Sequence, residues 1–390
     1  MYFDYTATTP MDEEILDAYV KIQKKYFANT TSLHKLGQTS NQIYEKTIQN
    51  IRDMLNVDHN VVFTSNATEA NNLGLLGYLK GKKGKVITTK LEHPSVYEVF
   101  KELEAEGYEV VYLGCNEKGI IKLDELEKEM SKEVLLVSVM WVNNIVGAIQ
   151  PIGDVINIVK KYPKCKLHVD MVQGLTKIKI NFNLKDIDMF TFSAHKFYGP
   201  KGIGALIYNK NMHLEKSIYG SSSQYGIKPG TFDLGLVVCL YKALKKYYDM
   251  QDENYNIVSK YRRYIYDHIN NHKVLINSDI NACSPFIISI SFKDIQGETL
   301  VHMLEANELY VSTGSSCSSK LKKPEKTIFA MTSDEKRASN TIRISLSHLT
   351  KMEEIEKLVE VINAIRWLYE WVIWYYISSL WWNDFKKEKL

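Results

Sequence analysis

The 390-residue sequence predicts an α/β protein whose first two-thirds form a mostly parallel sheet covered by helices. Strand-like and helix-like segments alternate up to about Met250, as expected for such a sheet. Polar and charged residues follow directly after several of these strands, where open α/β sheets bind ligands. After Met250 the pattern changes to a long helix and short strands, which indicates a second, smaller unit.

The predicted strands are short apolar runs bounded by polar or turn residues. In the first part they cover Val61 to Thr64, Lys85 to Thr89, Glu109 to Leu113, Val134 to Val142, Lys166 to Asp170, Asp188 to Phe192 and Gly204 to Tyr208. Helices are expected between them, for example Val96 to Glu106 and Leu123 to Ser131. In the second part we expect a helix over Ile257 to Asn271, strands over Phe286 to Phe292 and Thr341 to Leu346, and a long terminal helix.

Composition is that of an ordinary globular protein, with 45% hydrophobic and 24% charged residues. The net charge is only +3 and its two signs are interleaved, so charge indicates no nucleic-acid partner. Five scattered cysteines suggest neither a disulfide framework nor a metal site. No signal-like start and no apolar run of about 20 residues is present, so we expect a cytoplasmic protein without a membrane span.

One lysine has the setting of a Schiff-base nucleophile. Lys196 lies in the turn Ser193 to Gly202, directly after an apolar strand, where its amine can be desolvated and lose its proton. A surface lysine beside a Gly/Pro turn is the alternative. A second apolar strand ends in Asp170, and pyridoxal-phosphate (PLP) enzymes need a lysine for the aldehyde and a carboxylate for the pyridine nitrogen.

These residues belong to a series of motifs that runs almost end to end. The chain resembles the cysteine desulfurases of the NifS/IscS-like group, within the fold-type I, class V aminotransferase superfamily. The matching segments, in order, are 2–10, 63–72, 91–93, 142–144, the Asp170 and Lys196 strands, 229–231, 313–317 and 341–346. The resemblance implies the PLP-dependent transferase fold type I: a large PLP-binding domain over 13–250 with a mostly parallel seven-stranded sheet, and a smaller α+β domain from 1–12 and 251–390.

The resemblance also implies roles around the ring of PLP. Lys196 holds the cofactor as a Schiff base and then moves the proton at the substrate Cα. Asp170 pairs with the pyridine nitrogen, and Gln173 reaches the ring hydroxyl. His93 stacks on the ring and relays protons, while Asn144 contacts the ring hydroxyl or the substrate. A surface glutamine and a structural histidine are the alternatives for Gln173 and His93.

Phosphate and substrate contacts follow from the same resemblance. Thr231 reaches the phosphate of the other subunit, which implies a homodimer with shared sites. Arg343 binds the substrate carboxylate through its planar fork; a structural ion pair is the alternative. No metal is implied. The residues assigned to the phosphate within one chain are Ala67, Thr68, Ser193 and His195.

Cys317 decides the reaction. It lies in a small, polar run followed by several lysines, whose charges favour the thiolate. An incidental loop cysteine is the alternative. In the desulfurase reading, Cys317 attacks the sulfur of L-cysteine, which leaves L-alanine and a persulfide. The sulfur then passes to an acceptor protein, such as a scaffold for iron–sulfur cluster assembly, or to tRNA thiolation.

Four departures from the family pattern put dimer contacts, substrate fit and rate in question. Trp141 and Ile145 replace the usual histidine and glutamate, and Tyr225 and Lys228 stand where arginines are expected. Two other readings stay open: a selenocysteine lyase or another class V PLP enzyme, and, motivated by these departures, a weakly active PLP-binding scaffold protein. The scaffold would present the aromatic C-terminal helix, in which three tryptophans share one face: Trp367, Trp371 and Trp374.

Overall fold

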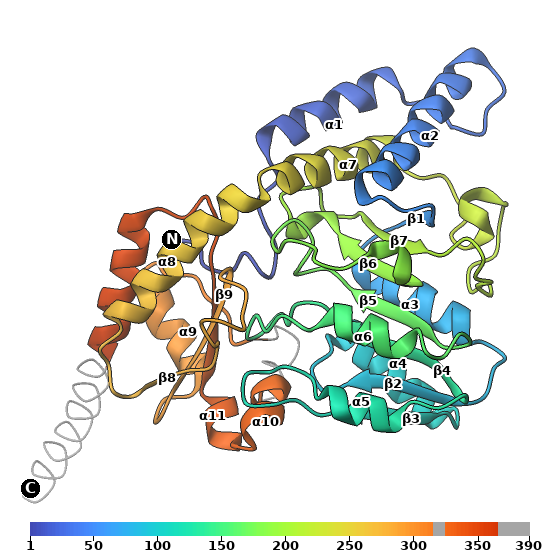
Figure 1. Ribbon diagram of the computed structural model, residues 1–390. Helices are drawn as coiled ribbons and strands as arrows, with labels where there is room; N and C mark the ends of the chain where they lie inside the picture. Colours follow the sequence, from blue (N-terminus) through green and yellow to red (C-terminus); the bar gives the residue numbers. More distant parts are fainter. Residues whose placement is uncertain (315–323, 366–390) are drawn as a thin grey trace, which may run out of the picture.

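The computed structural model describes residues 1–314 and 324–365, and a seven-stranded sheet is its centre (Figure 1). The strand order is β1-β7-β6-β5-β4-β2-β3. Only β7 runs antiparallel to its neighbours, so the prediction of a mostly parallel seven-stranded sheet is confirmed. The strands are β1 (Asn60–Thr64), β2 (Lys85–Thr89), β3 (Glu109–Leu113), β4 (Val134–Met140), β5 (Lys166–Asp170), β6 (Met189–Ser193) and β7 (Gly204–Tyr208).

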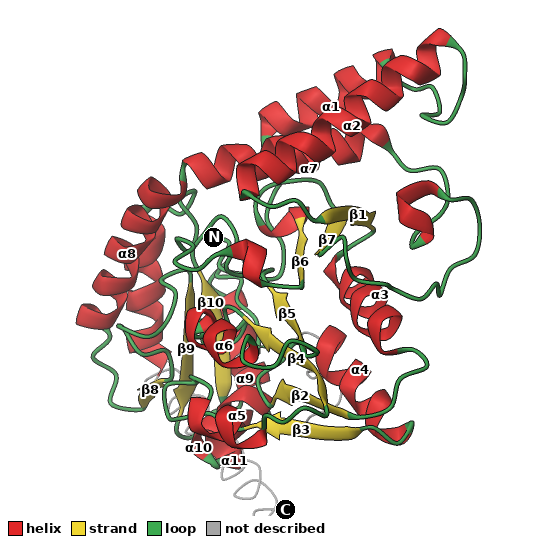
Figure 2. Ribbon diagram, turned by 45° about the vertical axis from the view of Figure 1, so that its right-hand side comes forward, coloured by secondary structure: helices red, strands yellow, loops and turns green. Residues whose placement is uncertain are grey.

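Helices cover both faces of this sheet, and Figure 2 shows α3 and α4 on one side and α5 and α6 on the other. A buried apolar layer separates each group from the strands, which explains why the central strands are apolar on both faces. The helices of this part are α1 (Glu13–Lys25), α2 (Lys35–Leu55), α3 (Ala67–Leu79), α4 (Pro94–Ala105), α5 (Leu123–Glu129), α6 (Ile152–Val159) and α7 (Leu234–Asp249), with 3-10 turns at Leu184–Asp186, Ala194–Lys196 and Ser223–Gly226.

The predicted strand bounds agree closely with the structure, and the differences have local causes. The strand predicted to end at Val142 ends at Met140, because Val142 pairs with Ile149 instead of continuing along β5. The helix predicted from Ile257 begins at Gln251 as α8 (Gln251–His268). Its polar first turn hides this start from a hydrophobicity pattern, although acidic residues there favour a helix N-terminus.

The second part of the chain is built on a three-stranded antiparallel sheet in the order β10-β9-β8. The N-terminal residues join it, since Tyr2 pairs with Tyr310 and Asp4 with Ser345. This supports the predicted grouping of 1–12 with 251–390, whose bounds stay a prediction. The elements are β8 (Val274–Ile276), β9 (Ile287–Phe292), β10 (Thr341–Ser345), α9 (Gly297–Glu305), α10 (Lys326–Thr332) and α11 (Glu335–Ser339), and residues 352–365 are also helical.

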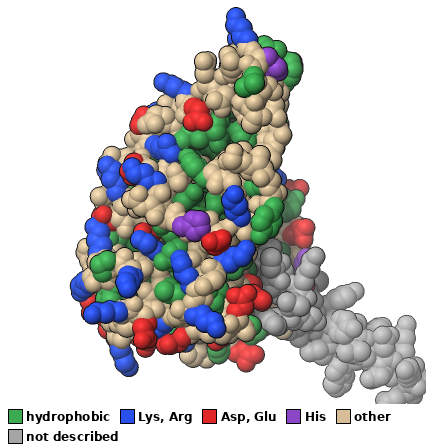
Figure 3. Space-filling view, turned by 90° about the vertical axis from the view of Figure 1, so that its right-hand side faces the viewer, with side chains coloured by type: hydrophobic (Ala, Val, Ile, Leu, Met, Phe, Trp, Pro, Cys, Tyr) green, Lys and Arg blue, Asp and Glu red, His purple; other side chains and the backbone are tan. Residues whose placement is uncertain are grey.

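The tryptophan-rich segment after residue 366 lies outside the described residues. Within the part of the chain that is described, no helix combines the length and the apolar character that crossing a membrane requires. On the face shown in Figure 3, lysine and arginine side chains are interspersed with aspartate and glutamate rather than gathered into one patch. This mixed surface agrees with the interleaved charges of the sequence.

Candidate active site

A cavity of about 350 Å³ lies where strand ends of the large sheet meet the N-termini of α3 and α4 and strand β10 of the smaller sheet. Of the predicted site residues that the structure describes, all but Thr231 line this cavity. These lining residues are Ala67, Thr68, His93, Asn144, Asp170, Gln173, Ser193, His195, Lys196 and Arg343.

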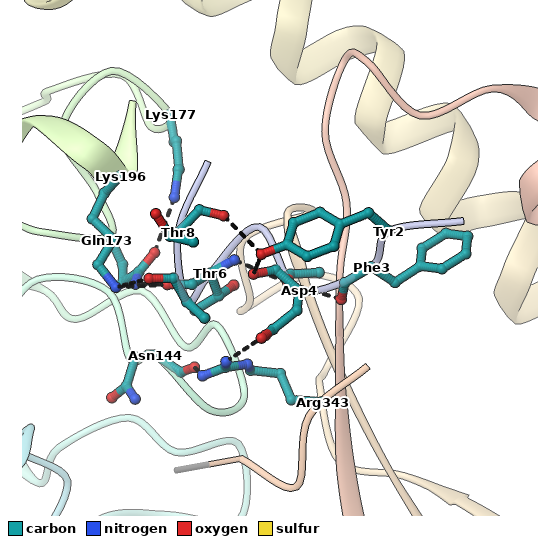
Figure 4. Close-up of polar contacts among 12 residues, drawn as sticks. Tyr2, Phe3, Asp4, Thr6, Thr8, Asn144, Gln173, Lys177, Lys196 and Arg343 are labelled. Carbon is teal, nitrogen blue, oxygen red and sulfur yellow. Dashed lines mark hydrogen bonds and ion pairs between the residues drawn. The ribbon is translucent and has the colours of Figure 1, made fainter. Parts of the chain in front are cut away.

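Lys196 projects into the cavity from the 3-10 turn that follows β6. Its Nζ donates hydrogen bonds to the carbonyl oxygens of Thr6 and Ala7, each at 2.8 Å (Figure 4). Burial, and next the nearby Arg343 guanidinium, lower the pKa of Lys196 to about 8. With this pKa, roughly a tenth of the molecules carry a neutral Lys196 amine at pH 7, far more than at the ordinary lysine pKa, and the neutral amine is the nucleophile for an aldehyde.

Asp170 ends β5 and is only 5% exposed. One carboxylate oxygen accepts from the backbone N–H of Val172 at 3.0 Å and the other from Asn71 Nδ2 at 3.1 Å. Burial raises the pKa of Asp170, an effect that its hydrogen bonds and the charge of Lys196 only partly offset. A protonated ring nitrogen would pair with this buried carboxylate and stabilise its charged form.

The N-terminus of α3 forms an anion-binding corner. Asn66 caps the helix, and its side chain accepts from the N–H of Glu69, so the N–H groups of Ala67 and Thr68 remain available to a phosphate. Gly204 lets β7 approach this corner, because a Cβ there would lie 2.8 Å from the Asn66 carbonyl carbon and 3.1 Å from Ala67 N. Neither Asn66 nor Gly204 was predicted from the sequence to belong to the site.

Ser193, the last residue of β6, and His195, in the turn that carries Lys196, both border the cavity. The ring Nδ1 of His195 is 3.2 Å from the hydroxyl of Thr8, and burial lowers its pKa to about 4. His195 is therefore neutral at physiological pH, so any phosphate contact it makes is a hydrogen bond rather than an ion pair.

The N-terminal segment crosses the site, which was not expected from its sequence. Besides accepting from Lys196, the carbonyl oxygen of Thr6 accepts from Gln173 Nε2 at 3.1 Å. The other end of the Gln173 amide accepts from Lys177 Nζ at 2.9 Å. Lys177 is a buried lysine whose pKa burial lowers to about 7. The protonated amine of Lys177 can only donate, so it orients the amide of Gln173 with Oε1 toward Lys177 and Nε2 toward the carbonyl oxygen of Thr6.

Arg343 enters the cavity from β10 and is almost fully buried. Its Nη2 pairs with Asp4 at 2.9 Å, and its Nη1 donates to the carbonyl oxygen of Asn144 at 3.0 Å (Figure 4). The guanidinium thus makes the structural ion pair that was the alternative in the sequence analysis. It also lines the cavity, where a substrate carboxylate can approach it.

Two predicted residues are not among those described as lining the cavity. Thr231 borders a neighbouring hollow together with Ser65 and Lys228, and its hydroxyl accepts from Asn29 at 3.5 Å. Its predicted contact with the phosphate of another subunit stays a prediction. Cys317 lies outside the described residues, three residues after Gly314, which does line the cavity.

Two of the departures from the family pattern have local explanations in the core. Trp141 is buried and packs against the backbone of Gly174, where a Cβ would lie 2.2 Å from the indole. Ile145 belongs to a small apolar cluster, and both Ile145 and the buried Glu325 approach Gly314. A second carboxylate at position 145 would repel Glu325, whose pKa burial already raises. Neither Trp141 nor Ile145 borders the cavity.

The other two departures lie on the phosphate side of the molecule. Lys228 pairs with Glu69 in the first turn of α3, so the positive charge expected from an arginine is kept. Tyr225 is half-exposed, and its hydroxyl accepts from Arg52 at 3.0 Å. Lys228 thus keeps a positive charge at its position, whereas Tyr225 offers a neutral hydroxyl where an arginine is expected.

Comparisons with known proteins agree with this geometry. The family model described as "Aminotransferase class-V" matches residues 1–358. A "NifS/IcsS protein homolog" of Lactobacillus delbrueckii subsp. bulgaricus is 34% identical over 94% of this chain and 97% of its own. A "Cysteine desulfurase IscS" of Neisseria meningitidis is 33% identical over 93% of this chain and 91% of its own.

Solved structures show the same likeness. A "NIFS-LIKE PROTEIN" superposes with a TM-score of 0.87 at 32% identity, covering 94% of this chain and 99% of its own. A NifS-like protein from Rickettsia africae has a TM-score of 0.84 at 26% identity, with the same coverage of 94% and 99%.

The fold, the site and these matches together define a class V aminotransferase, the family to which the chain belongs. Within that family its relatives fall in the NifS/IscS group. Proteins of this family are PLP-dependent. The described residues fit this cofactor, since the cavity offers an amine of lowered pKa, a buried carboxylate without a cation, and a helix N-terminus for a phosphate.

Proposed function

We propose that this protein is a PLP-dependent cysteine desulfurase, which converts L-cysteine to L-alanine and receives the sulfur on Cys317 as a persulfide. The observation that carries this proposal is that Lys196, Asp170 and Arg343 line one cavity. Gly314 also lines this cavity and precedes Cys317 by three residues in the sequence. The relatives named cysteine desulfurase support the same reaction.

The described residues divide the work of holding cofactor and substrate. Lys196 would form the Schiff base, Asp170 would keep the pyridine nitrogen protonated, and the α3 N-terminus with Ala67 and Thr68 would hold the phosphate. PLP, when bound, supplies an electron-withdrawing ring that acidifies the substrate Cα–H.

Residues that line the same cavity would also bind the substrate and move its proton. Arg343 would bind the substrate carboxylate from the β10 side, opposite the sheet that carries Lys196. The neutral Nζ of Lys196 would take the proton from the substrate Cα, because its lowered pKa lets it accept and return a proton near neutral pH.

Sulfur transfer needs a second nucleophile. The thiolate of Cys317 would attack the substrate sulfur, so that the substrate C–S bond breaks, an S–S bond forms, and the carbon skeleton leaves as alanine after protonation. The four cysteines in the described part are poor alternatives, because burial raises the pKa of each thiol: Cys115, Cys165, Cys239 and Cys283.

The assembly and pathway are part of the same proposal. We expect a cytoplasmic homodimer in which Thr231 completes the phosphate site of the partner subunit. A sulfur-acceptor protein, such as a scaffold for iron–sulfur cluster assembly or an enzyme of tRNA thiolation, would then take the persulfide sulfur.

The test is anaerobic incubation of the purified protein with L-cysteine and a reductant, with alanine and sulfide measured together. The parent should make both. Cys317→Ala and Lys196→Ala should make neither, while two matched controls should retain the activity. In these controls Cys115→Ala removes a half-buried cysteine outside the cavity, and Lys201→Ala removes an exposed lysine from the same turn as Lys196.

A PLP-loaded parent that makes no alanine from L-cysteine would overturn the proposal. Faster turnover of selenocysteine would then favour a selenocysteine lyase. No turnover of either amino acid would favour the scaffold reading.

A further inference from the structure

A chain of buried hydrogen bonds links His93 to Asp170 behind the cavity wall. Asn71 Nδ2 donates to Asp170 at 3.1 Å and to the hydroxyl of Ser95 at 2.9 Å. The Ser95 hydroxyl is in turn 2.8 Å from His93 Nδ1. Asn71 comes from α3 and Ser95 from α4, so two helix N-termini and the end of β5 contribute to one network.

The orientation of Asn71 follows from its neighbours. Its Oδ1 accepts from the hydroxyl of Thr191 at 2.6 Å, and its Nδ2 faces the carboxylate of Asp170. Turning the amide over would place two acceptors against each other at Asp170. The hydroxyl of Ser95 therefore accepts from Asn71, and its own hydrogen is left for His93 Nδ1.

A second donor makes the assignment at His93 independent of the Ser95 hydroxyl. The backbone N–H of Ser95 donates to His93 Nδ1 at 3.1 Å, as His93 caps the N-terminus of α4. A backbone N–H can only donate, so Nδ1 must be the unprotonated nitrogen of the ring. In a neutral imidazole the proton is then on Nε2, the nitrogen on the far side of the ring from Ser95.

We propose that Ser95 and Asn71 are positioning residues that hold His93 as a neutral imidazole with its proton on Nε2. His93 then offers the cavity a hydrogen-bond donor, suited to an anionic oxygen or sulfur of the cofactor or substrate. The predicted proton relay by His93 during turnover stays a prediction. The substrate part of this inference rests on the proposed desulfurase function; the tautomer does not.

The positive charges around the ring also favour the neutral imidazole. Lys196 from the turn after β6, Lys326 from α10 and Arg343 from β10 all face His93, and each disfavours an imidazolium. Burial is the largest cause and lowers the pKa of His93 to about 4. Asp170, the carboxylate of the network, reaches His93 only through Asn71 and Ser95, so it does not form an ion pair with the ring.

The test is NMR spectroscopy of the full-length protein labelled with ¹⁵N-histidine, without cofactor and loaded with PLP. Long-range ¹H–¹⁵N spectra distinguish a protonated from an unprotonated ring nitrogen, and His93→Gln identifies the signals among the 10 histidines. We expect Nε2–H and an unprotonated Nδ1, unchanged from about pH 5.5 to pH 8, the range in which an ordinary histidine titrates.

Ser95→Ala removes one of the two donors to Nδ1 and should raise the apparent pKa of His93 by up to about one unit. Ser138→Ala is the matched control, because the Ser138 hydroxyl lies 2.8 Å from Nδ1 of the buried His168 in the same way. That control should shift the signals of His168 and leave those of His93 in place.

A proton on Nδ1 of His93, or a titration of His93 near its ordinary pKa in the parent protein, would overturn the proposal. So would an equal effect of Ser138→Ala and Ser95→Ala on His93, since both would then act through core packing. These spectra do not depend on turnover. A protein that fails to make alanine but shows the Nε2–H form would disprove the proposed function and leave this inference standing.

Discussion

The two sides of the cavity are built differently. The cofactor side consists of strand ends of the large sheet and helix N-termini. Asp170 ends β5, and Lys196 lies in the turn that follows the neighbouring strand β6. The substrate side is assembled from distant segments: Arg343 of β10 pairs with Asp4, which lies 339 residues away in sequence. Thr6 and Ala7, close to Asp4, then accept from Lys196.

Because of this difference, we expect substitutions on the two sides of the cavity to have different effects. The cofactor side is held by backbone hydrogen bonds of a sheet buried on both faces. On the substrate side, the chain between Asp4 and Thr8 contacts both units of the molecule, so a movement of one unit relative to the other would act on it directly. We therefore expect substitutions to separate cofactor retention from substrate binding.

The largest effect is expected at Arg343. Arg343→Gln should raise the KM for L-cysteine about 100-fold, because a charge-assisted hydrogen bond to a carboxylate contributes about 1.5–3 kcal/mol. The affinity for PLP should stay nearly unchanged, as measured by fluorescence titration of the cofactor-free protein. The KM of Arg343→Lys should lie between those of the parent and Arg343→Gln, since lysine keeps the charge but lacks the planar, two-pronged guanidinium.

An equal loss of PLP affinity and of L-cysteine binding in Arg343→Gln would mean that Arg343 serves mainly as the partner of Asp4. Asp4→Asn separates these roles, because it removes the ion pair and leaves the guanidinium in place.

A smaller effect is expected on the cofactor side at Gly204. Gly204→Ala would place a Cβ 2.7 Å from the carbonyl oxygen of Phe192 and 2.8 Å from the carbonyl carbon of Asn66, and neither backbone atom can move away easily. The expected cost is about 2 kcal/mol of unfolding free energy, measured by urea denaturation, with faster loss of PLP on dialysis. Gly153→Ala in α6 is the control, because its Cβ meets nothing within 4 Å; it should be neutral or slightly stabilising.

The smallest expected effect is the change, per pH unit, in the rate at which PLP attaches to the protein. The free amine of Lys196 is the reactive form, and its pKa is lowered to about 8. Below that pH the neutral fraction falls about tenfold per unit, so the rate at which cofactor-free protein binds PLP covalently should fall in the same proportion and level off above about pH 8. Borohydride trapping followed by mass spectrometry measures this rate, with Lys196→Ala as the blank. A profile still rising toward the ordinary lysine pKa would show that the amine is not desolvated.

Much of the fold and the cofactor side could be predicted because the signals are local. Four strands of the large sheet have the predicted bounds, since each is a short apolar run with polar flanks: β2, β3, β5 and β7. Lys196 and Asp170 could be recognised from the strands that precede them. Asn71 and Ser95 could not, because a polar residue in a helix shows no sign in the sequence of which distant group it meets.

The sequence by itself determined the strand and helix pattern, the family, and the residue types that a PLP site needs, because backbone periodicity and side-chain chemistry are properties of the chain in order. Only the tertiary structure decided that Arg343 meets Asp4, that the carbonyl oxygens of Thr6 and Ala7 accept from Lys196, and that Ser95 fixes the tautomer of His93. Hydrogen bonds depend on distances of about 3 Å and on angles, and these arise only when segments far apart in sequence pack against one another.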